Sequence, residues 1–301
     1  MKGRMKITLG ACLALLVVMS VGAYVAYRDF VGAEAFDEGF YAAGGDRGSK
    51  FSYDSYATVL HTHVDDKGMV SYSALGKSPA ELNRFVRALA AVDPKTYDSW
   101  DEQAQVAFWI NAYNALTLRA IIDHYPIKAG LISGLAYPKN SIRQIAGVWD
   151  KVQFLVMDKR MTLNQIEHEI LRAKFYEPRI HVALVCAAMG CPPLRNEPFL
   201  GDKLDEQLND QAKRFLADPA KFRIDRGSGK VHLSSIFKWF GEDFVKGHKP
   251  DGDFASGGSD SEKAVLHFIS GYLPAQDAEY LKTGKYEVAY LDYDWSLNER
   301  K

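Results

Sequence analysis

Apolar residues recur at helical spacing in two long stretches of the chain, and one of these stretches is apolar on almost every side. Residues 103–123, QAQVAFWINAYNALTLRAIID, have the pattern of a helix buried inside a domain. Residues 80–92, AELNRFVRALAAV, repeat apolar residues at helical spacing and predict a second helix. Ser78 is expected as the N-cap of this second helix, with Pro79 at its first position.

Shorter apolar runs predict a few strands between the helices. A strand is expected at VQFLVM (152–157), followed by a helix that starts at Thr162, because Thr162 and Gln165 form a capping-box pattern. The best candidate for a buried strand is IHVALVC (180–186). Three more segments complete the prediction: FRID (222–225) and KVHL (230–233) as a hairpin across GSG, and VAYLDYD as a last edge strand. We therefore predict an α+β fold, a mostly helical single domain with a small, largely antiparallel sheet.

The N-terminal pattern is of another kind, because residues 7–26 carry no charge over twenty positions. This length spans a bilayer as a helix, and the basic residues before it orient the N-terminus toward the cytosol. The rest of the chain is then expected outside the cytosol, in a bacterial periplasm. A signal peptide cleaved near Ala23 is the alternative, since small residues stand there.

The domain organisation follows from this division. Residues 1–28 are assigned as the membrane anchor or signal sequence. Residues 29–50 are rich in Gly and Ala and have no sustained period, so they are interpreted as a tether. Residues 51–298 form the predicted single domain.

Charge and composition exclude several classes of function. The chain has 37 basic and 38 acidic residues, and no basic block with interleaved aromatic residues that would indicate a nucleic-acid surface. Nucleic acid is therefore not expected as a partner. GGDRGSK lacks the spacing of a phosphate-binding loop, so no nucleotide or other cofactor is predicted.

Two cysteines in RIHVALVCAAMGCPPLR are the most reactive groups in the predicted domain. Cys186 ends the apolar run, and Cys191 stands between Gly190 and a Pro-Pro pair. Outside the cytosol, two cysteines separated by a short loop favour a disulfide. A reactive thiol and a pair of inert, packed thiols are the two alternatives that the sequence leaves open.

If a thiol is reactive, Cys191 with His181 is the better pair. A regular strand would place His181 and Cys186 on opposite faces, whereas the turn at Gly190 brings Cys191 back toward His181. Glu167 or Asn111, with Asn114 on the same helix face, are candidates to orient the histidine. The alternative for the two asparagines is helix-to-helix or helix-to-loop hydrogen bonding.

Metal binding is disfavoured by the spacing of the histidines. Glu167-His168-Glu169 lacks a second histidine four positions after the first, where Arg172 stands. His61 and His63 would share a face only in a strand, and no further ligands accompany them.

Five stretches carry a resemblance to a known family. In chain order they are FWINAYNALTL, IEHEILR, RIHVALVCAAMGCPPLRNE, LSSIFKWFGEDF and YDWSLN. Together they resemble, over roughly residues 55–298, the family called domain of unknown function 547, whose name assigns no activity. The resemblance implies a fold similar to papain-like or transglutaminase-like thiol enzymes. In papain-like enzymes the nucleophile begins the central buried helix, whereas the buried helix here contains no cysteine.

Two functions from different classes follow. The first is a non-catalytic domain that binds an envelope peptide, glycan or protein in an aromatic-lined cleft, with the two cysteines joined. The second is a hydrolase or acyl transferase acting on an amide through Cys191, with His181 as base. The first is preferred because a disulfide accounts for both cysteines.

Overall fold

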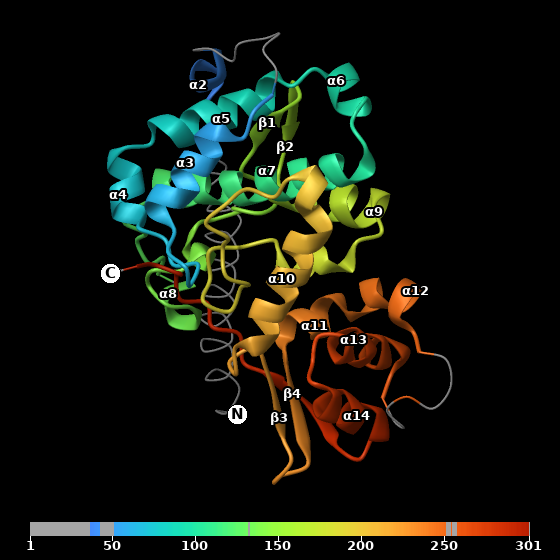
Figure 1. Ribbon diagram of the computed structural model, residues 1–301. Helices are drawn as coiled ribbons and strands as arrows, with labels where there is room; N and C mark the ends of the chain where they lie inside the picture. Colours follow the sequence, from blue (N-terminus) through green and yellow to red (C-terminus); the bar gives the residue numbers. More distant parts are fainter. Residues whose placement is uncertain (1–36, 43–50, 132, 251–253, 255–257, 301) are drawn as a thin grey trace, which may run out of the picture.

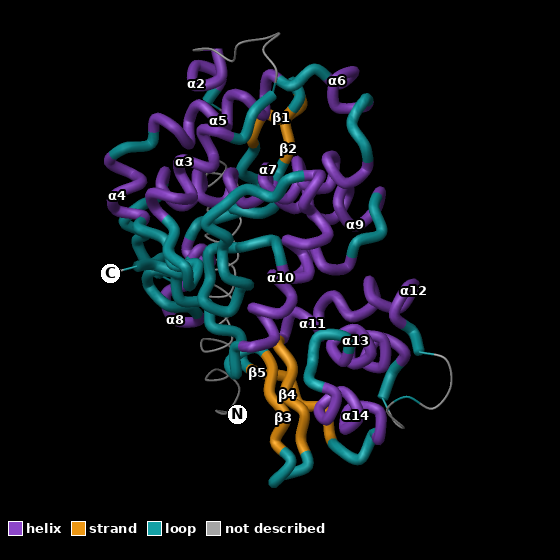
Figure 2. Tube along the Cα trace, viewed as in Figure 1, coloured by secondary structure: helices purple, strands orange, loops and turns teal. Residues whose placement is uncertain are grey.

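The computed structural model describes residues 37–42, 51–131, 133–250, 254 and 258–300. Figure 1 shows a large helical part, from α2 to α10, and a smaller part that contains β3, β4 and the helices α11–α14. The helices and strands fall into an α+β arrangement with two small sheets, as predicted (Figure 2).

Helices supply most of the fold. In chain order the α-helices are α2 (Glu38–Ala42), α3 (Asp54–His63), α4 (Tyr72–Lys77), α5 (Ala80–Ala91), α6 (Pro94–Asp98), α7 (Glu102–Asp123), α8 (Ser133–Ala136), α9 (Arg172–Lys174), α10 (Leu204–Ala217), α11 (Ser235–Phe240), α12 (Val245–His248), α13 (Asp260–Ser270) and α14 (Ala275–Thr283). Short 3-10 turns occur at Ile142–Gln144, Pro178–Val182, Gly201–Lys203 and Gly241–Phe244, and Gln165–Leu171 is a π-helix.

Four strands of the two sheets lie in predicted segments, whereas β2 was not predicted. β1 (Phe154–Val156) pairs with β2 (Lys159–Met161) in an antiparallel hairpin. β3 (Phe222–Asp225) and β4 (Lys230–Ser234) form the predicted hairpin, and β5 (Glu287–Leu291) lies at the edge beside β4. β5 runs parallel to β4, so the larger sheet is mixed rather than antiparallel throughout.

The central helix α7 confirms the prediction for residues 103–123. Its start is fixed by the carboxylate of Asp101, which accepts a hydrogen bond from the N–H of Ala104 at 2.8 Å. From Val106 onward almost every side chain of α7 is buried, as its nearly uniform apolar pattern requires. The helix α5 is also confirmed, but it begins at Ala80 with Pro79 as its N-cap, because Ser78 ends the preceding helix α4.

The strand predicted at 180–186 is wrong. The segment begins with the 3-10 turn Pro178–Val182 and continues without strand pairing through Cys186. Its backbone is bonded to a side chain instead: the Asn114 amide donates to the carbonyl of Ala183 at 3.0 Å and accepts from the N–H of Val185 at 2.8 Å. A continuous apolar run does not distinguish a buried strand from another buried segment. Here the side-chain amide of Asn114 makes backbone hydrogen bonds that a neighbouring strand would otherwise make.

Two clusters of buried apolar side chains form the core. The larger surrounds α3, α5 and α7, and the smaller lies between β3–β5 and the helices α11, α13 and α14. Tyr293 packs against both clusters. The chain between residues 180 and 191 also passes between them, since Val182 belongs to the smaller cluster and Ala183 to the larger.

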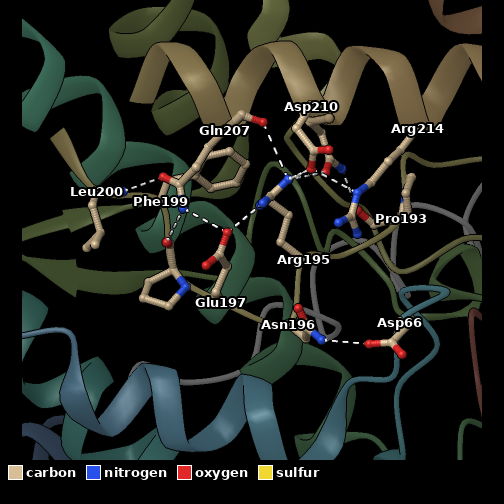
Figure 3. Close-up of polar contacts among 12 residues, drawn as sticks. Asp66, Pro193, Arg195, Asn196, Glu197, Phe199, Leu200, Gln207, Asp210 and Arg214 are labelled. Atoms are coloured by element: carbon tan, nitrogen blue, oxygen red, sulfur yellow. Dashed lines mark hydrogen bonds and ion pairs between the residues drawn. The ribbon is translucent and has the colours of Figure 1, made fainter. Parts of the chain in front are cut away.

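A polar network fixes the segment that follows Cys191 (Figure 3). Arg195 is 9% exposed and forms ion pairs with Glu197 and with Asp210 of α10. Arg214, one turn further along α10, bonds the same Asp210 at 2.8 Å. The network therefore ties the chain after the cysteines to a helix of the core.

The predicted membrane segment, residues 7–26, lies outside the described residues. Among the helices that the structure describes, none has both the length and the apolar character needed to cross a membrane. Part of the predicted tether differs from a plain linker, because Glu38–Ala42 form the short helix α2. Phe40 of α2 packs under the guanidinium groups of Arg87 and Arg119, at 5.0 and 4.6 Å from its ring centre.

Candidate functional site

A cavity of about 360 Å³ lies at the meeting of the two core clusters. It is lined by four residues proposed from the sequence: Glu167, His181, Cys186 and Cys191. Large aromatic side chains form much of its wall: Trp149, Trp239, Phe240, Tyr293 and Trp295. The volume is in the range of small-molecule or side-chain binding pockets. We define this space as the aromatic cavity.

His181 is held by a carboxylate that the sequence reasoning missed. Its Nε2 lies 2.7 Å from the Oδ2 of Asp243, which stands in the 3-10 turn Gly241–Phe244. The imidazole also stacks on Phe240, with ring centres 4.2 Å apart. Burial lowers the pKa of His181 despite the neighbouring carboxylate, so the ring is neutral at physiological pH.

Arg172 completes this network from the other side of Asp243. Its Nε and Nη2 donate to the two carboxylate oxygens at 2.5 and 2.8 Å. Burial alone would raise the pKa of Asp243, but the bonds from His181 and Arg172 outweigh it and hold that pKa far below its usual range. Asp243 is therefore a permanent anion that orients the histidine, the role proposed for Glu167 or Asn111.

Glu167 is a buried acid on the cavity wall, in the π-helix Gln165–Leu171. Burial raises its pKa to about 7, although the Tyr113 hydroxyl donates a hydrogen bond to it. A carboxyl group with this pKa exchanges its proton near neutral pH, as general acids and bases do. Single π-helical turns are frequent at functional sites, and this one places Glu167 inside while His168 is exposed.

Cys186 and Cys191 form a disulfide, with their Cα atoms 6.2 Å apart. The single O–H of Tyr293 faces both sulfur atoms, with its oxygen 3.2 Å from the Sγ of Cys186 and 3.1 Å from that of Cys191. The backbone N–H of Cys186 points to the Sγ of Cys191 at 2.9 Å. His181 and Cys186 line the same cavity, because the segment between them is not the regular strand that would separate them.

Asn111 is not among the residues that line the cavity. Its amide donates to the carbonyl of Phe199 at 2.7 Å and accepts from the N–H of Phe199 at 3.0 Å. Asn114, one turn along, makes the bonds to the Ala183–Val185 backbone described above. Both asparagines therefore make the helix-to-loop hydrogen bonds that were the alternative interpretation, and Asn114 positions the segment that leads to Cys186.

The aromatic wall is supported by a cation. Arg143 lies over the rings of Tyr137, Trp149 and Trp295, at 4.4, 5.6 and 5.0 Å from their centres. Trp295 in turn contacts Tyr293 and Trp239. In the sequence, Trp239, Phe240, Tyr293 and Trp295 stand in the stretches LSSIFKWFGEDF and YDWSLN, where spacing alone does not distinguish core residues from cavity residues.

The histidine pair His61 and His63 does not form a metal site. Both lie in α3, where two positions of separation place side chains on opposite sides of the helix, so His61 is exposed and His63 is buried. In the part of the chain that the structure describes, no group of three or more His, Cys, Asp or Glu side chains could hold a metal ion.

Comparison with known proteins gives a match to one family model but indicates no activity. No curated protein and no solved structure gives a significant match to the chain. A family model matches residues 97–216, which contain Glu167, His181 and both cysteines, while Asp243, Tyr293 and the aromatic residues around them lie beyond the match. The matched region is shorter than the resemblance predicted over residues 55–298. The model that matches these residues is that of the uncharacterised family described as "Protein of unknown function, DUF547".

Proposed function

We propose that this protein is an extracytoplasmic binding domain, tethered to the membrane by residues 7–26, that holds a peptide segment in the aromatic cavity. The observation that carries the proposal is the composition of the cavity wall. Aromatic side chains line the cavity, whereas polar groups beside them, such as those of His181 and Tyr293, are already hydrogen-bonded to other protein groups.

Trp239 is the clearest contact for a ligand. This side chain is 48% exposed, which is unusual for a large apolar residue, and it lines the cavity. Its ring lies 4.9 Å from the ring of Tyr293 and 6.2 Å from that of Trp295. Rigid aromatic groups of this kind supply much of the binding energy in protein interfaces.

The polar groups favour a peptide over a glycan. His181 is bonded to Asp243, His168 to Arg172, and Tyr293 to the sulfur atoms. A glycan carries hydroxyl groups around every ring, and each loses free energy if it is buried without a partner. An apolar peptide side chain requires no such partners, so it fits the cavity better.

The cysteine pair supports the proposed location. Disulfides form and persist in oxidising compartments outside the cytosol, and they are rare in cytosolic proteins. The charge-free run at residues 7–26, with basic residues before it, would place the domain on that side of the membrane.

Peptide binding is tested with the full-length protein and defined hexapeptides. The peptides are acetylated and amidated Gly-Ser-X-Ser-Gly-Ser, with X as Phe, Leu, Asp or Lys. Each peptide is added to the protein in increasing concentration, and binding is followed by the change in tryptophan fluorescence. The Phe and Leu peptides should give saturable changes, and the Asp and Lys peptides should not. If chitohexaose gives a saturable change and none of the peptides does, the ligand of the cavity is a glycan and the peptide proposal is wrong.

The matched pair of variants is Trp239→Ala and Tyr176→Ala. Both residues are exposed aromatic side chains, but only Trp239 lines the cavity. Trp239→Ala should weaken binding of the Phe peptide about tenfold or more, as loss of an aromatic anchor does. Equal affinity in the two variants would contradict the assignment of the cavity.

Cysteine-dependent hydrolysis of an amide is the second candidate, and one observation favours it. Asp243 orients His181 as an acid orients the base of a thiol enzyme, and Cys191 lines the same cavity as this histidine. This chemistry requires the disulfide to be reduced first. After reduction, His181→Ala should slow alkylation of Cys191 by iodoacetamide about tenfold, and an unchanged rate would eliminate this candidate.

A further inference from the structure

The Sγ atom of Cys191 has two hydrogen-bond donors directed at it. One is the backbone N–H of Cys186, at 2.9 Å, and the other is the hydroxyl of Tyr293, at 3.1 Å. A sulfur in a disulfide carries no proton, so both groups are donors in this state. When the S–S bond breaks, a thiolate on Cys191 would receive both bonds without any rearrangement, and hydrogen bonds to a charged acceptor are the stronger kind.

Tyr293 remains a donor under all ordinary conditions. Its side chain is partly buried, and this burial, together with the charges of Glu167 and Asp294, raises the pKa of its hydroxyl. The proton therefore stays on the oxygen that faces the two sulfur atoms. A preorganised donor of this type stabilises negative charge that develops during a reaction.

The two sulfur-bearing residues differ in accessibility. Cys186 is half-buried and Cys191 is only 5% exposed, while both line the aromatic cavity. A thiol that enters the cavity therefore reaches Cys186 more easily. Cys191, with its two donors, is the better leaving group, because thiol–disulfide exchange is faster when the leaving thiolate is stabilised.

The C-terminal segment holds the loop between the cysteines in place. The N–H groups of Met189 and Gly190 each donate at 2.7 Å, to the carbonyls of Ser296 and Asp294. A side chain at Gly190 would come within 2.7 Å of the Tyr293 ring, so only glycine lets the tyrosine approach the sulfur atoms this closely. Reduction of the disulfide would leave these contacts intact and keep the two thiols together.

We propose that the Cys186–Cys191 disulfide oxidises pairs of thiols in peptides held by the aromatic cavity, an activity that rests on the peptide binding proposed above. In the first step a peptide thiolate attacks the Sγ of Cys186. A peptide–Cys186 disulfide forms, the Cys186–Cys191 bond breaks, and the electron pair leaves on Cys191 as a thiolate.

The second step releases the product. The second thiolate of the peptide attacks the peptide sulfur of the mixed disulfide, and Cys186 leaves as a thiolate. The two thiol protons of the peptide pass through water to the two protein thiolates. The peptide dithiol is oxidised by two electrons to a disulfide, and the protein disulfide is reduced to two thiols. Glutathione disulfide, a small-molecule oxidant, would restore the starting state by the same exchange in reverse.

The test uses the oxidised full-length protein with two reduced probes. One is acetyl-Cys-Gly-Phe-Cys-amide, whose Phe side chain suits the cavity, and the other is dithiothreitol, which needs no binding site. The protein should convert the peptide to its disulfide with one-to-one stoichiometry, followed by the mass of both products, and should regain its own disulfide with glutathione disulfide.

Tyr293→Phe and Tyr290→Phe are the matched variants. Tyr290 is also a partly buried tyrosine, but its hydroxyl bonds Glu262 and not a sulfur. Tyr293→Phe should slow oxidation of both probes about tenfold and raise the pKa of the Cys191 thiolate in the reduced protein, read from its ultraviolet absorbance. Tyr290→Phe should change neither quantity. A structural role of Tyr293 alone would not move the thiolate pKa.

The two proposals fail in different ways. If the hexapeptides bind but neither dithiol is oxidised, the exchange activity is overturned and the binding function stands. The exchange proposal is also overturned if Tyr293→Phe reacts at the wild-type rate. If dithiothreitol is oxidised in a Tyr293-dependent manner and no peptide binds, exchange at this disulfide stands and the peptide function is wrong.

Discussion

Arg195 and Arg172 each bind carboxylates, but the two networks differ in what surrounds them. Arg195 joins Glu197 and Asp210, and all three fasten the chain after Cys191 to α10 (Figure 3). Arg172 binds Asp243, whose second partner is His181 on the aromatic cavity. Both networks look alike as ion pairs, but His181 of the second network lines the aromatic cavity and Arg195 does not.

The two networks also differ in the protonation of the carboxyl groups that belong to them or lie beside them. Near Arg195, the pKa values of Glu197 and Asp210 are lowered, because the arginine bonds outweigh the opposing effect of burial, so both carboxylates stay charged. Beside the second network lies Glu167, whose buried carboxyl has a pKa of about 7. A network that is charged at every working pH holds structure together, whereas a group that titrates near neutral pH suits chemistry or binding.

The largest expected effect is on stability, from Arg195→Ala. It leaves Glu197 without its cation, leaves Asp210 with Arg214 alone and removes packing over the Phe199 ring. We expect the free energy of unfolding to fall by about 3 kcal/mol in urea titrations, the lower end of the range for a broken buried ion pair, because the guanidinium is buried but each carboxylate is 42% exposed.

The control is Arg214→Ala, which removes a second ligand of the same Asp210. Arg214 is 46% exposed, so its loss should cost less than about 1 kcal/mol. If Arg195→Ala cost no more than this control, the Arg195 network would not be the anchor of the cysteine segment.

The second prediction concerns pH and Glu167. The pKa of this carboxyl is raised in the folded protein, so it favours folding while it is protonated. This contribution is fully present below the unfolded pKa, near 4.5, and is lost as the pH rises through about 7. The loss should be on the order of 2–3 kcal/mol between pH 4.5 and 8.

Glu167→Gln isolates this effect from other titrating groups. The glutamine keeps the shape but does not titrate, so the stability difference between the variant and the wild type should shift in favour of the variant as the pH rises. Urea titrations of both proteins at several pH values measure the difference. A difference that stays constant from pH 4.5 to 8 would show that folding does not raise the pKa of Glu167.

The sequence predicted the elements whose pattern is local. The helix at 103–123 followed from an apolar surface on all sides, and the hairpin β3–β4 from two short apolar runs across GSG. Thr162 and Gln165 make both hydrogen bonds of the predicted capping box, at 3.1 and 3.2 Å. Such features depend on neighbours within a few residues, which a sequence displays directly.

The parts that were wrong or missed depend on distant partners. The segment 180–186 looks like a strand, but its bonds go to Asn114, about seventy positions earlier. Asp243 was missed as the partner of His181 because 62 residues separate them and nothing in GEDF marks one acid as buried. Residue type alone identified His181, Glu167 and the two cysteines as candidates. That they line one cavity could be seen only in the folded structure.

The third prediction separates Asn111 from the candidate site. Its amide bonds the Phe199 backbone twice and also bonds the Tyr53 side chain, and it does not line the aromatic cavity. Asn111→Leu should reduce the free energy of unfolding by about 1–3 kcal/mol, because the Phe199 N–H and carbonyl lose their partner. At temperatures where the variant is folded, its affinity for the Phe hexapeptide should equal that of the wild type. Lost affinity in a folded variant would return Asn111 to the site.

The smallest expected effect completes the comparison with an arginine whose own side chain is exposed. Arg84 pairs with Glu81 one turn earlier on α5, and its side chain is 65% exposed. Water and salt screen such a pair, and both side chains lose freedom when they meet, so Arg84→Ala should change the free energy of unfolding by less than about 0.5 kcal/mol. The three arginine variants then rank by the exposure of the guanidinium: Arg195, Arg214 and Arg84, from the largest loss to the smallest. A loss at Arg84 comparable to that at Arg195 would mean that charge itself, and not its burial against α10, sets the stability of these networks.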